Sequence, residues 1–201
     1  MATYAFTDEE AEVLSHKPRL GELSVGEKVA EADLLKQQGN LYFKAGMFKK
    51  AVQQYLKIFL YVNGLSVAGD GMSSYARGNS KATEDEGVAI TQLKIAAYSN
   101  MAMCQLKLDN PDKAIELADK VLALEPGHTK ARLRKAQAYR QKGKFTVARD
   151  VLREALVAEP KNAALRNELK QVLDEIQLHP EVDEMKAKMA NIFNKSGGIY
   201  K

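Results

Sequence analysis

Residues 102–126 read AMCQLKLDNPDKAIELADKVLALEP, and residues 136–160 read AQAYRQKGKFTVARDVLREALVAEP. The two stretches align without a gap at a spacing of 34 residues. Small or cyclic residues recur at that spacing in three pairs, which are Ala102 and Ala136, Ala114 and Ala148, and Pro126 and Pro160. An internal period of this length is typical of a helix–turn–helix unit that buries its apolar face only by stacking on copies of itself. The period therefore predicts an all-α superhelix of stacked helix pairs.

A third copy precedes these two once an insertion is allowed. Gly39 and Ala51 stand 12 residues apart, as do Ala102 and Ala114. The distance from Gly39 to Ala102 is 63 residues, which exceeds one period of 34 by 29 residues. Gly or Ala at these places lets two antiparallel helices approach closely where they cross. The sequence thus predicts three helix pairs, with an insertion after the first.

The composition excludes several classes of protein. The chain has 201 residues, a formal charge of +4 and a single cysteine, Cys104, which we interpret as a small core residue. That charge is too small to indicate nucleic-acid binding. We find no apolar run long enough for a membrane span and no signal peptide, so we expect a cytoplasmic protein.

Metal-binding and catalytic signatures are also missing from the sequence. His16, His128 and His179 are scattered, with no partner at ligand spacing. Neither a nucleophile–base arrangement nor a complete phosphate-binding loop occurs. We therefore expect no cofactor and no enzymatic activity.

Capping and breaking residues divide the chain into segments. Thr7 to Glu10 resembles a capping box, and Ser24 with Glu27 forms a second one before a long helical pattern. The expected segments are an N-terminal lead-in (1–23), repeat one (24–62), a flexible insertion (63–87), repeat two (88–126), repeat three (127–160), a capping helix (161–178), a C-terminal helix (180–195) and a tail (196–201). The insertion and the basic C-terminal helix are candidate contacts for a second protein partner.

The residues at fixed places in these repeats resemble the tetratricopeptide repeat (TPR). Matching positions are Leu35, Gly39, Tyr42, Ala51 and Tyr55 in repeat one, Tyr98, Ala102, Ala114, Ala118 and Pro126 in repeat two, and Ala136, Tyr139, Ala148, Leu152, Ala155 and Pro160 in repeat three. The resemblance implies a right-handed superhelix of three TPR helix pairs with a C-terminal capping helix. Two similar groups are the repeat domains of immunophilin co-chaperones, here without an isomerase domain, and the tetratricopeptide repeat protein 9 family.

Polar residues with helical spacing are expected to meet in the concave groove of such a superhelix. Lys36 and Asn40 are four residues apart, as are Lys130 and Arg134, so each pair shares one helix face. Asn100 lies on the helix between them. Three cations and two amides from adjacent helices would suit a ligand with two carboxylates, such as a peptide that ends in Asp.

The same five positions are similar to the carboxylate clamp of TPR co-chaperones. That resemblance implies binding of the C-terminal EEVD tail of a 70- or 90-kDa heat-shock chaperone, with Phe43, Met103 and Gln137 touching the other side chains of the peptide. The alternative is a scaffold that binds an internal helix or peptide of another complex, with Lys36, Lys130 and Arg134 as ordinary solvated charges. A clamp needs the free terminal carboxylate of its ligand, whereas a scaffold does not.

Overall fold

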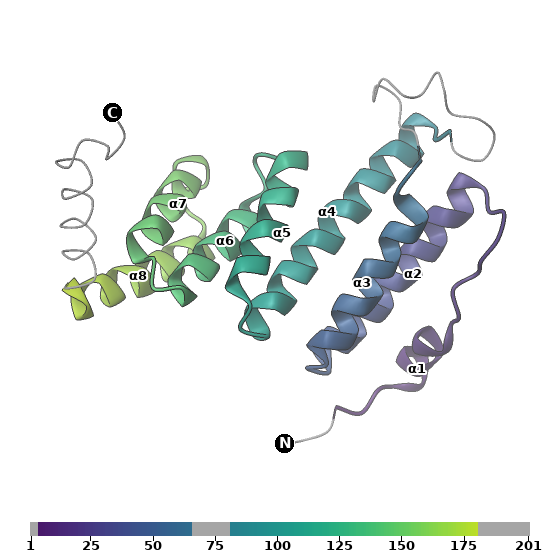
Figure 1. Cartoon of the computed structure of the whole chain (residues 1–201), viewed down its shortest axis with the longest axis horizontal. Helices are drawn as coiled ribbons and strands as arrows, with labels where there is room; N and C mark the ends of the chain where they lie inside the picture. The colour runs from purple at the N-terminus through teal and green to yellow at the C-terminus, as the bar shows by residue number, and fades with distance from the viewer. Residues whose placement is uncertain (1–3, 66–80, 181–201) are drawn as a thin grey trace, which may run out of the picture.

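The computed structural model describes residues 4–65 and 81–180. The helices of this part are α1 (Asp8–Ser15), α2 (Val25–Lys44), α3 (Phe48–Val62), α4 (Glu84–Lys107), α5 (Pro111–Leu124), α6 (Thr129–Gln141), α7 (Phe145–Ala158) and α8 (Ala163–Leu178). Figure 1 shows them side by side in chain order, from α1 at one end to α8 at the other. The expected C-terminal helix and tail lie outside the described residues.

The helices form two layers. Each of the pairs α2/α3, α4/α5 and α6/α7 is an antiparallel hairpin, and each hairpin packs on the next. The first helices of the pairs also contact one another in series, since α2 touches α4, α4 touches α6, and α6 touches α8. We call α2, α4, α6 and α8 the inner layer, and α3, α5 and α7 the outer layer. The predicted all-α fold of three stacked pairs and a capping helix is confirmed.

The insertion is shorter than the sequence suggested. Thr83 caps α4, its side chain accepting a hydrogen bond from the backbone N–H of Glu86 while the Glu86 carboxylate accepts one from the backbone of Thr83. This capping box starts α4 at Glu84, so the last four residues assigned to the insertion are helical. On either side of residues 66–80, Leu65 and Ala82 are buried in the core of the first two helix pairs.

The small residues of the repeat pattern lie where each pair of helices crosses. Ala51, Ala102, Ala114, Ala136 and Ala148 are fully buried. Gly39 is the most constrained of these positions, because a Cβ atom there would overlap the aromatic ring of Tyr55 on α3. The close crossing predicted from the period is therefore present, and in the first pair only glycine fits without a shift.

A left-handed residue joins the two helices of every repeat. Gly46 (φ 72°), Asp109 (φ 56°) and Gly143 (φ 64°) occupy equivalent places in the three turns. Glycine adopts this conformation without steric cost, and Asp tolerates it better than most residues because its short side chain can bond locally. The three turns thus share one backbone geometry in spite of their different sequences.

An N-terminal strap, which we define as residues 13–19, ties α1 to the first helix pair. The Glu31 side chain on α2 is only 3% exposed and accepts a hydrogen bond from Nε of Arg19 at 2.6 Å. Nε2 of His16 lies 2.8 Å from the other carboxylate oxygen. Burial raises the pKa of Glu31, but the hydrogen bonds from Arg19 and His16 outweigh this effect and bring that pKa to about 2. Glu31 is therefore an anionic anchor for the strap.

Two neutral side chains fasten the backbone of the same strap. Nε2 of Gln38, on α2, donates to the carbonyl oxygens of Val13 and His16 at 2.9 Å each. The hydroxyl of Tyr61, on α3, donates to the carbonyl of Arg19 at 2.8 Å. Buried polar groups need such partners, and Gln38 is only 3% exposed. The segment expected to be a lead-in is consequently a built part of the fold.

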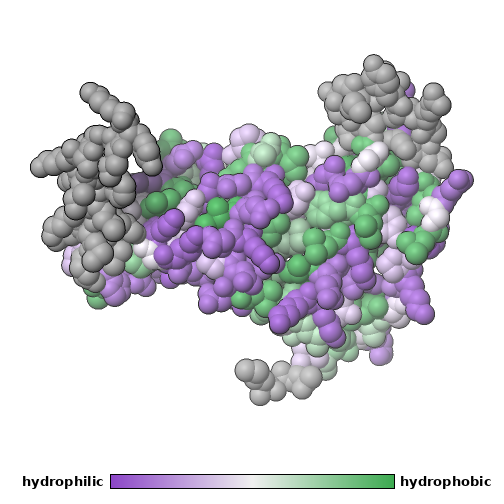
Figure 2. Space-filling model, viewed as in Figure 1, coloured by the Kyte–Doolittle hydropathy of each residue, from purple (hydrophilic) through white to green (hydrophobic). Residues whose placement is uncertain are grey.

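The outer layer is not uniformly polar. Figure 2 shows apolar surface gathered over α3 and α4, whereas the half formed by α5 to α7 is mostly hydrophilic. Leu56 and Leu60, one turn apart on α3, are 54% and 78% exposed, and Val88 on α4 is 59% exposed. Leu56 and Leu60 therefore add apolar surface to the outer layer, and Val88 adds some on the adjacent helix α4.

Candidate functional site

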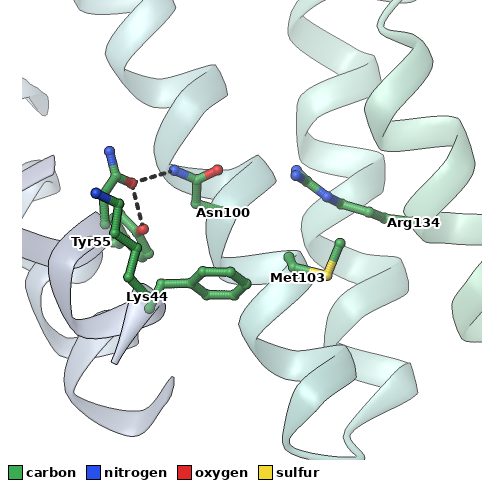
Figure 3. A pocket seen from close by; sticks show the side chains of 7 residues that line it. Lys44, Tyr55, Asn100, Met103 and Arg134 are labelled. Atoms are coloured by element: carbon green, nitrogen blue, oxygen red, sulfur yellow. Dashed lines mark hydrogen bonds between the residues drawn. The ribbon is translucent and has the colours of Figure 1, made fainter. Parts of the chain in front are cut away.

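Two joined cavities open along the inner layer. The first, of about 380 Å³, lies between α2, α4 and α6 and is lined by Asn40, Phe43, Lys44, Tyr55, Asn100, Met103 and Arg134 (Figure 3). The second, of about 330 Å³, shares Phe43 and Met103 with the first and is completed by Leu106, Lys107, Gln137, Arg140 and Gln141. We call the two cavities together the groove. Six of the eight residues proposed from sequence line it, and Lys36 and Lys130 do not.

The two predicted asparagines are joined directly. Oδ1 of Asn40 accepts a hydrogen bond from Nδ2 of Asn100 at 3.1 Å and a second from the hydroxyl of Tyr55 at 2.7 Å (Figure 3). Tyr55 is 1% exposed and comes up from α3 beneath the groove. These bonds occupy the amide oxygen of Asn40, which leaves its NH₂ group to donate to a ligand.

Arg134 supplies a charge that is partly withdrawn from water. Its Nη1 donates to both the carbonyl and the hydroxyl of Ser99 on α4. Burial lowers the pKa of Arg134 below its usual value, but a guanidinium stays charged at any physiological pH. Because water screens this position less than an open surface, the cation attracts an incoming anion more strongly there.

Cys104 lies below the groove as a core residue. Its side chain is fully buried, and burial raises the pKa of the thiol to about 12. The thiol is therefore protonated at neutral pH, whereas a reactive cysteine needs the thiolate. The interpretation of Cys104 as a core residue agrees with this environment.

The two remaining predicted cations lie outside the cavity linings. Lys36 is ion-paired with Asp33, one turn earlier on α2. Burial raises the pKa of Asp33, but hydrogen bonds from Lys36 and Gln37 outweigh this effect and bring that pKa below its usual value. Lys130 is exposed near the start of α6 and makes no ion pair within residues 4–65 and 81–180. Both ammonium groups sit on long stems, one turn before Asn40 and Arg134 respectively.

Lys44 and Tyr55 are site residues that the sequence reasoning missed. Lys44 follows Lys36 and Asn40 at intervals of four, so helical spacing alone could have placed it on the same face. Tyr55 was recognised as a repeat residue, but nothing in the repeat pattern indicates its bond to Asn40.

The capping helix also reaches the groove. Glu168 of α8 is 5% exposed and accepts a hydrogen bond from Nε of Arg140 at 2.6 Å. Its second oxygen accepts from Nε2 of Gln137 at 3.1 Å. One buried carboxylate thus fixes two groove-lining side chains of α6, and the groove depends on α8 as well as on the three repeats.

The described part of the chain offers neither a metal site nor a membrane span. Within residues 4–65 and 81–180, no group of three or more His, Cys, Asp or Glu side chains is placed to hold a metal ion. Among the helices of that same part, none is both long and apolar enough to cross a membrane.

Comparison with known proteins assigns part of the repeat array to a known family. A family model for the tetratricopeptide repeat matches residues 105–171. Peptidyl-prolyl cis-trans isomerase FKBP4 of Bos taurus is 29% identical over 174 residues, which cover 87% of this chain and 34% of that protein. The chain therefore spans about a third of the length of this curated relative.

Solved structures show the same fold. The TPR-containing domain of a putative FK506-binding protein of Plasmodium falciparum superposes with a TM-score of 0.62 at 21% identity, covering 80% of this chain and 97% of that one. The first TPR domain of Spaghetti (RPAP3), bound to the HSP90 peptide SRMEEVD, superposes with a TM-score of 0.53 at 23% identity, covering 73% and 95%. The resemblance to the tetratricopeptide repeat protein 9 family stays a prediction. The chain described here contains a tetratricopeptide repeat domain, similar to those of FKBP4 immunophilins and HSP90 co-chaperones.

Proposed function

We propose that the groove binds the free C-terminal end of an acidic peptide. The observation that carries this proposal is that Asn40, Asn100 and Arg134, from three separate helices, line one cavity. An amide NH₂ and a partly desolvated guanidinium are donors of the kind that carboxylate oxygens accept. A terminal Asp presents two carboxylates, which matches donors that come from opposite walls.

Lys36 and Lys130 complete the site by closing over the ligand. Lys36 first has to release or share Asp33, a pair whose carboxylate side chain is 42% exposed. Pairs of that kind contribute about 0–1 kcal/mol, so the exchange for a ligand carboxylate costs little. Lys130 has no such pair to break within the described part of the chain. Together the two ammonium groups supply the remaining charge of the clamp.

Apolar contacts extend the site beyond the carboxylates. Phe43 and Met103 border both cavities, so a side chain a few residues upstream of the terminus would lie against them. Gln137 lines the second cavity, where Glu168 holds one of its amide hydrogens and leaves the rest of the amide for a ligand. Charge-assisted hydrogen bonds contribute about 1.5–3 kcal/mol each, and four or five of them reach the roughly 8 kcal/mol of a micromolar complex.

The partner that fits this chemistry best is the EEVD tail of a 70- or 90-kDa heat-shock chaperone. The Spaghetti domain, which has the same fold, is bound to such a peptide from HSP90. On this account the protein is a cytoplasmic adaptor or co-chaperone and acts by binding, not by catalysis. We extend that ligand to this chain because Asn40, Asn100 and Arg134 line its groove.

Calorimetric titration with a peptide ending in MEEVD tests the proposal. We expect micromolar binding, and we expect it to disappear when the C-terminus of the same peptide is amidated, because amidation removes one of the two carboxylates. Equal binding of the two peptides would favour the alternative, a scaffold that recognises an internal segment. Absence of binding to either would remove the clamp role from the groove.

A further inference from the structure

The acidic helix α1 stands beside the groove and touches one of its cations. Oε1 of Glu10 lies 3.6 Å from Nζ of Lys44. The Glu10 carboxylate is also fixed by the hydroxyl of Tyr4 at 3.2 Å and by the backbone N–H of Thr7 at 3.3 Å. The strap holds the helix itself, because Gln38 and Glu31 bind residues at its end and just after it. The negative charge at this place is therefore positioned by the fold.

A third cavity joins α1 to the groove. It measures about 340 Å³ and is lined by Glu9, Glu10, Val13, Gln37, Asn40, Leu41 and Lys44. Asn40 and Lys44 also line the first cavity, so the two spaces meet at these residues. A peptide whose terminus lies between Asn40 and Arg134 consequently has two ways out, one past Lys44 towards α1 and one past Phe43 towards α6.

The two ways out carry opposite charge. Towards α1 the lining includes the carboxylates of Glu9 and Glu10. Towards α6 the second cavity is bordered by Lys107 and Arg140. Like charges repel and opposite charges attract across a binding surface, which sets the orientation of a ligand more than its total affinity.

We propose that Glu9 and Glu10 determine the path and the affinity of the bound peptide. Their carboxylates keep acidic side chains away from α1, so the upstream residues of an acidic tail leave the groove over Lys107 and Gln141. Glu10 also competes with the carboxylates of the ligand for Lys44, which weakens binding of acidic tails. This inference rests on the proposed function of the groove, and it adds a selectivity element from outside the repeats.

Neutral variants of the full 201-residue chain test the effect on affinity. The double variant Glu9→Gln/Glu10→Gln keeps the capping box, because Gln serves at that position as well as Glu. We expect it to bind the MEEVD peptide about threefold more tightly than the unchanged protein at low salt, since exposed pairs have modest energies. The gain is expected to shrink at about 0.5 M salt, where exposed charges are screened.

Glu12→Gln is the matched control. It removes one negative charge from the same helix, where the double variant removes two, and Glu12 does not line any of the three cavities. We expect it to change peptide affinity much less than the double variant. A gain per neutralised carboxylate equal to that of the double variant would mean that only net charge matters, and it would overturn a specific role for Glu9 and Glu10.

A nitroxide on the N-terminus of the peptide tests the path. In the unchanged protein we expect it to broaden the amide resonances of Lys107 and Gln141 and to spare those of α1. In the double variant we expect broadening to spread to the amides of positions 9 and 10 and of Val13. Broadening centred on α1 in the unchanged protein would overturn the inference.

The failures of the two proposals are distinguishable. If the unchanged protein binds the peptide and the double variant binds it no more tightly, the role of α1 is wrong and the clamp stands. If only the double variant binds, α1 is confirmed as a competitor of the ligand. If neither binds, both proposals are wrong.

Discussion

The aromatic ring of Tyr55 occupies the space that a Cβ atom on Gly39 would need, and its hydroxyl donates to the side chain of the next residue, Asn40, at 2.7 Å. One aromatic side chain therefore forms both the crossing of the first helix pair and the floor of the groove. A change in how closely α2 approaches α3 has to alter the position of Asn40 as well.

Replacing Gly39 with Ala is expected to destabilise the protein. Overpacking of a buried crossing costs about 1–3 kcal/mol, of which roughly 1 kcal/mol is regained from helix propensity. We expect a net loss of up to about 2 kcal/mol in urea denaturation. Gly26→Ala is the control on the same helix, because its Cβ would meet only Oε1 of Glu86 at an ordinary 3.5 Å. Equal effects of the two substitutions would contradict the packing argument.

Charge reversal at Lys130 is expected to abolish binding of the acidic peptide and to leave helicity unchanged. Lys130 is exposed, so the fold does not depend on it. We expect a loss of tenfold or more in calorimetric titration, which is about 1.4 kcal/mol. Lys57→Glu makes the same change on the exposed outer face of α3 and is expected to leave binding nearly unaltered. Undiminished affinity in Lys130→Glu would contradict the clamp.

Removal of the Tyr55 hydroxyl is expected to weaken the peptide complex through Asn40. Tyr55→Phe deletes a hydrogen bond with a net contribution of about 0.5–1.5 kcal/mol to stability and frees Asn40 to turn away. We expect peptide affinity to fall by a few-fold, about 1 kcal/mol or less. In an Asn40→Ala background the same substitution should not affect binding further. Additive losses in that double-mutant cycle would show that Tyr55 acts by another route.

The pH dependence of stability is expected to report on Glu31. Its pKa of about 2 lies below the ordinary value of 4.5, so its contribution is complete above pH 4.5 and is lost as the pH falls towards 2. Because Arg19 is 53% exposed and the pair is partly screened, we expect a contribution on the order of 2 kcal/mol. Urea denaturation of the unchanged protein and of Glu31→Gln should give stabilities that converge between pH 4.5 and 2. Parallel pH profiles would contradict this assignment.

Replacing the glycine in the turn between α6 and α7 is expected to destabilise the protein. Gly143 has φ 64°, a conformation that costs an L-residue roughly 1–2 kcal/mol. Gly143→Ala should therefore lower the free energy of unfolding by about 1 kcal/mol. At the equivalent place Asp109→Gly relieves the same strain and should be neutral or stabilising in the same assay. A stabilising Gly143→Ala would contradict the turn geometry.

Local signals predicted most of the fold. The capping boxes at Thr7 and Ser24 both form, and α8 (Ala163–Leu178) falls within the predicted capping segment 161–178. These features are encoded within a few residues of one another, so they can be read without knowledge of tertiary contacts. The start of α4 was placed too late, although Thr83 and Glu86 have the spacing of a capping box.

Long-range polar contacts could not be predicted in the same way. The described part of the chain buries four polar or charged residues, which are Glu31, Gln38, Ser99 and Glu168. Each of them binds a residue at least 12 positions away, and none occupies a place in the repeat pattern. Periodicity shows which face of a helix is buried. It does not show which polar group on another helix a buried polar side chain binds. For this reason the strap, the bond of Arg134 to Ser99 and the reach of α8 were visible only in the structure.

The contact of Glu168 with Arg140 and Gln137 limits how freely this scaffold can be re-engineered. Repeat arrays are commonly lengthened or shortened by adding or deleting whole units ahead of a generic end helix. Here an extra unit between α7 and α8 would carry Glu168 away from the wall of the groove and leave the Arg140 guanidinium without its carboxylate. A transplantable binding unit cut from this chain would have to retain the third repeat and α8 as a single piece.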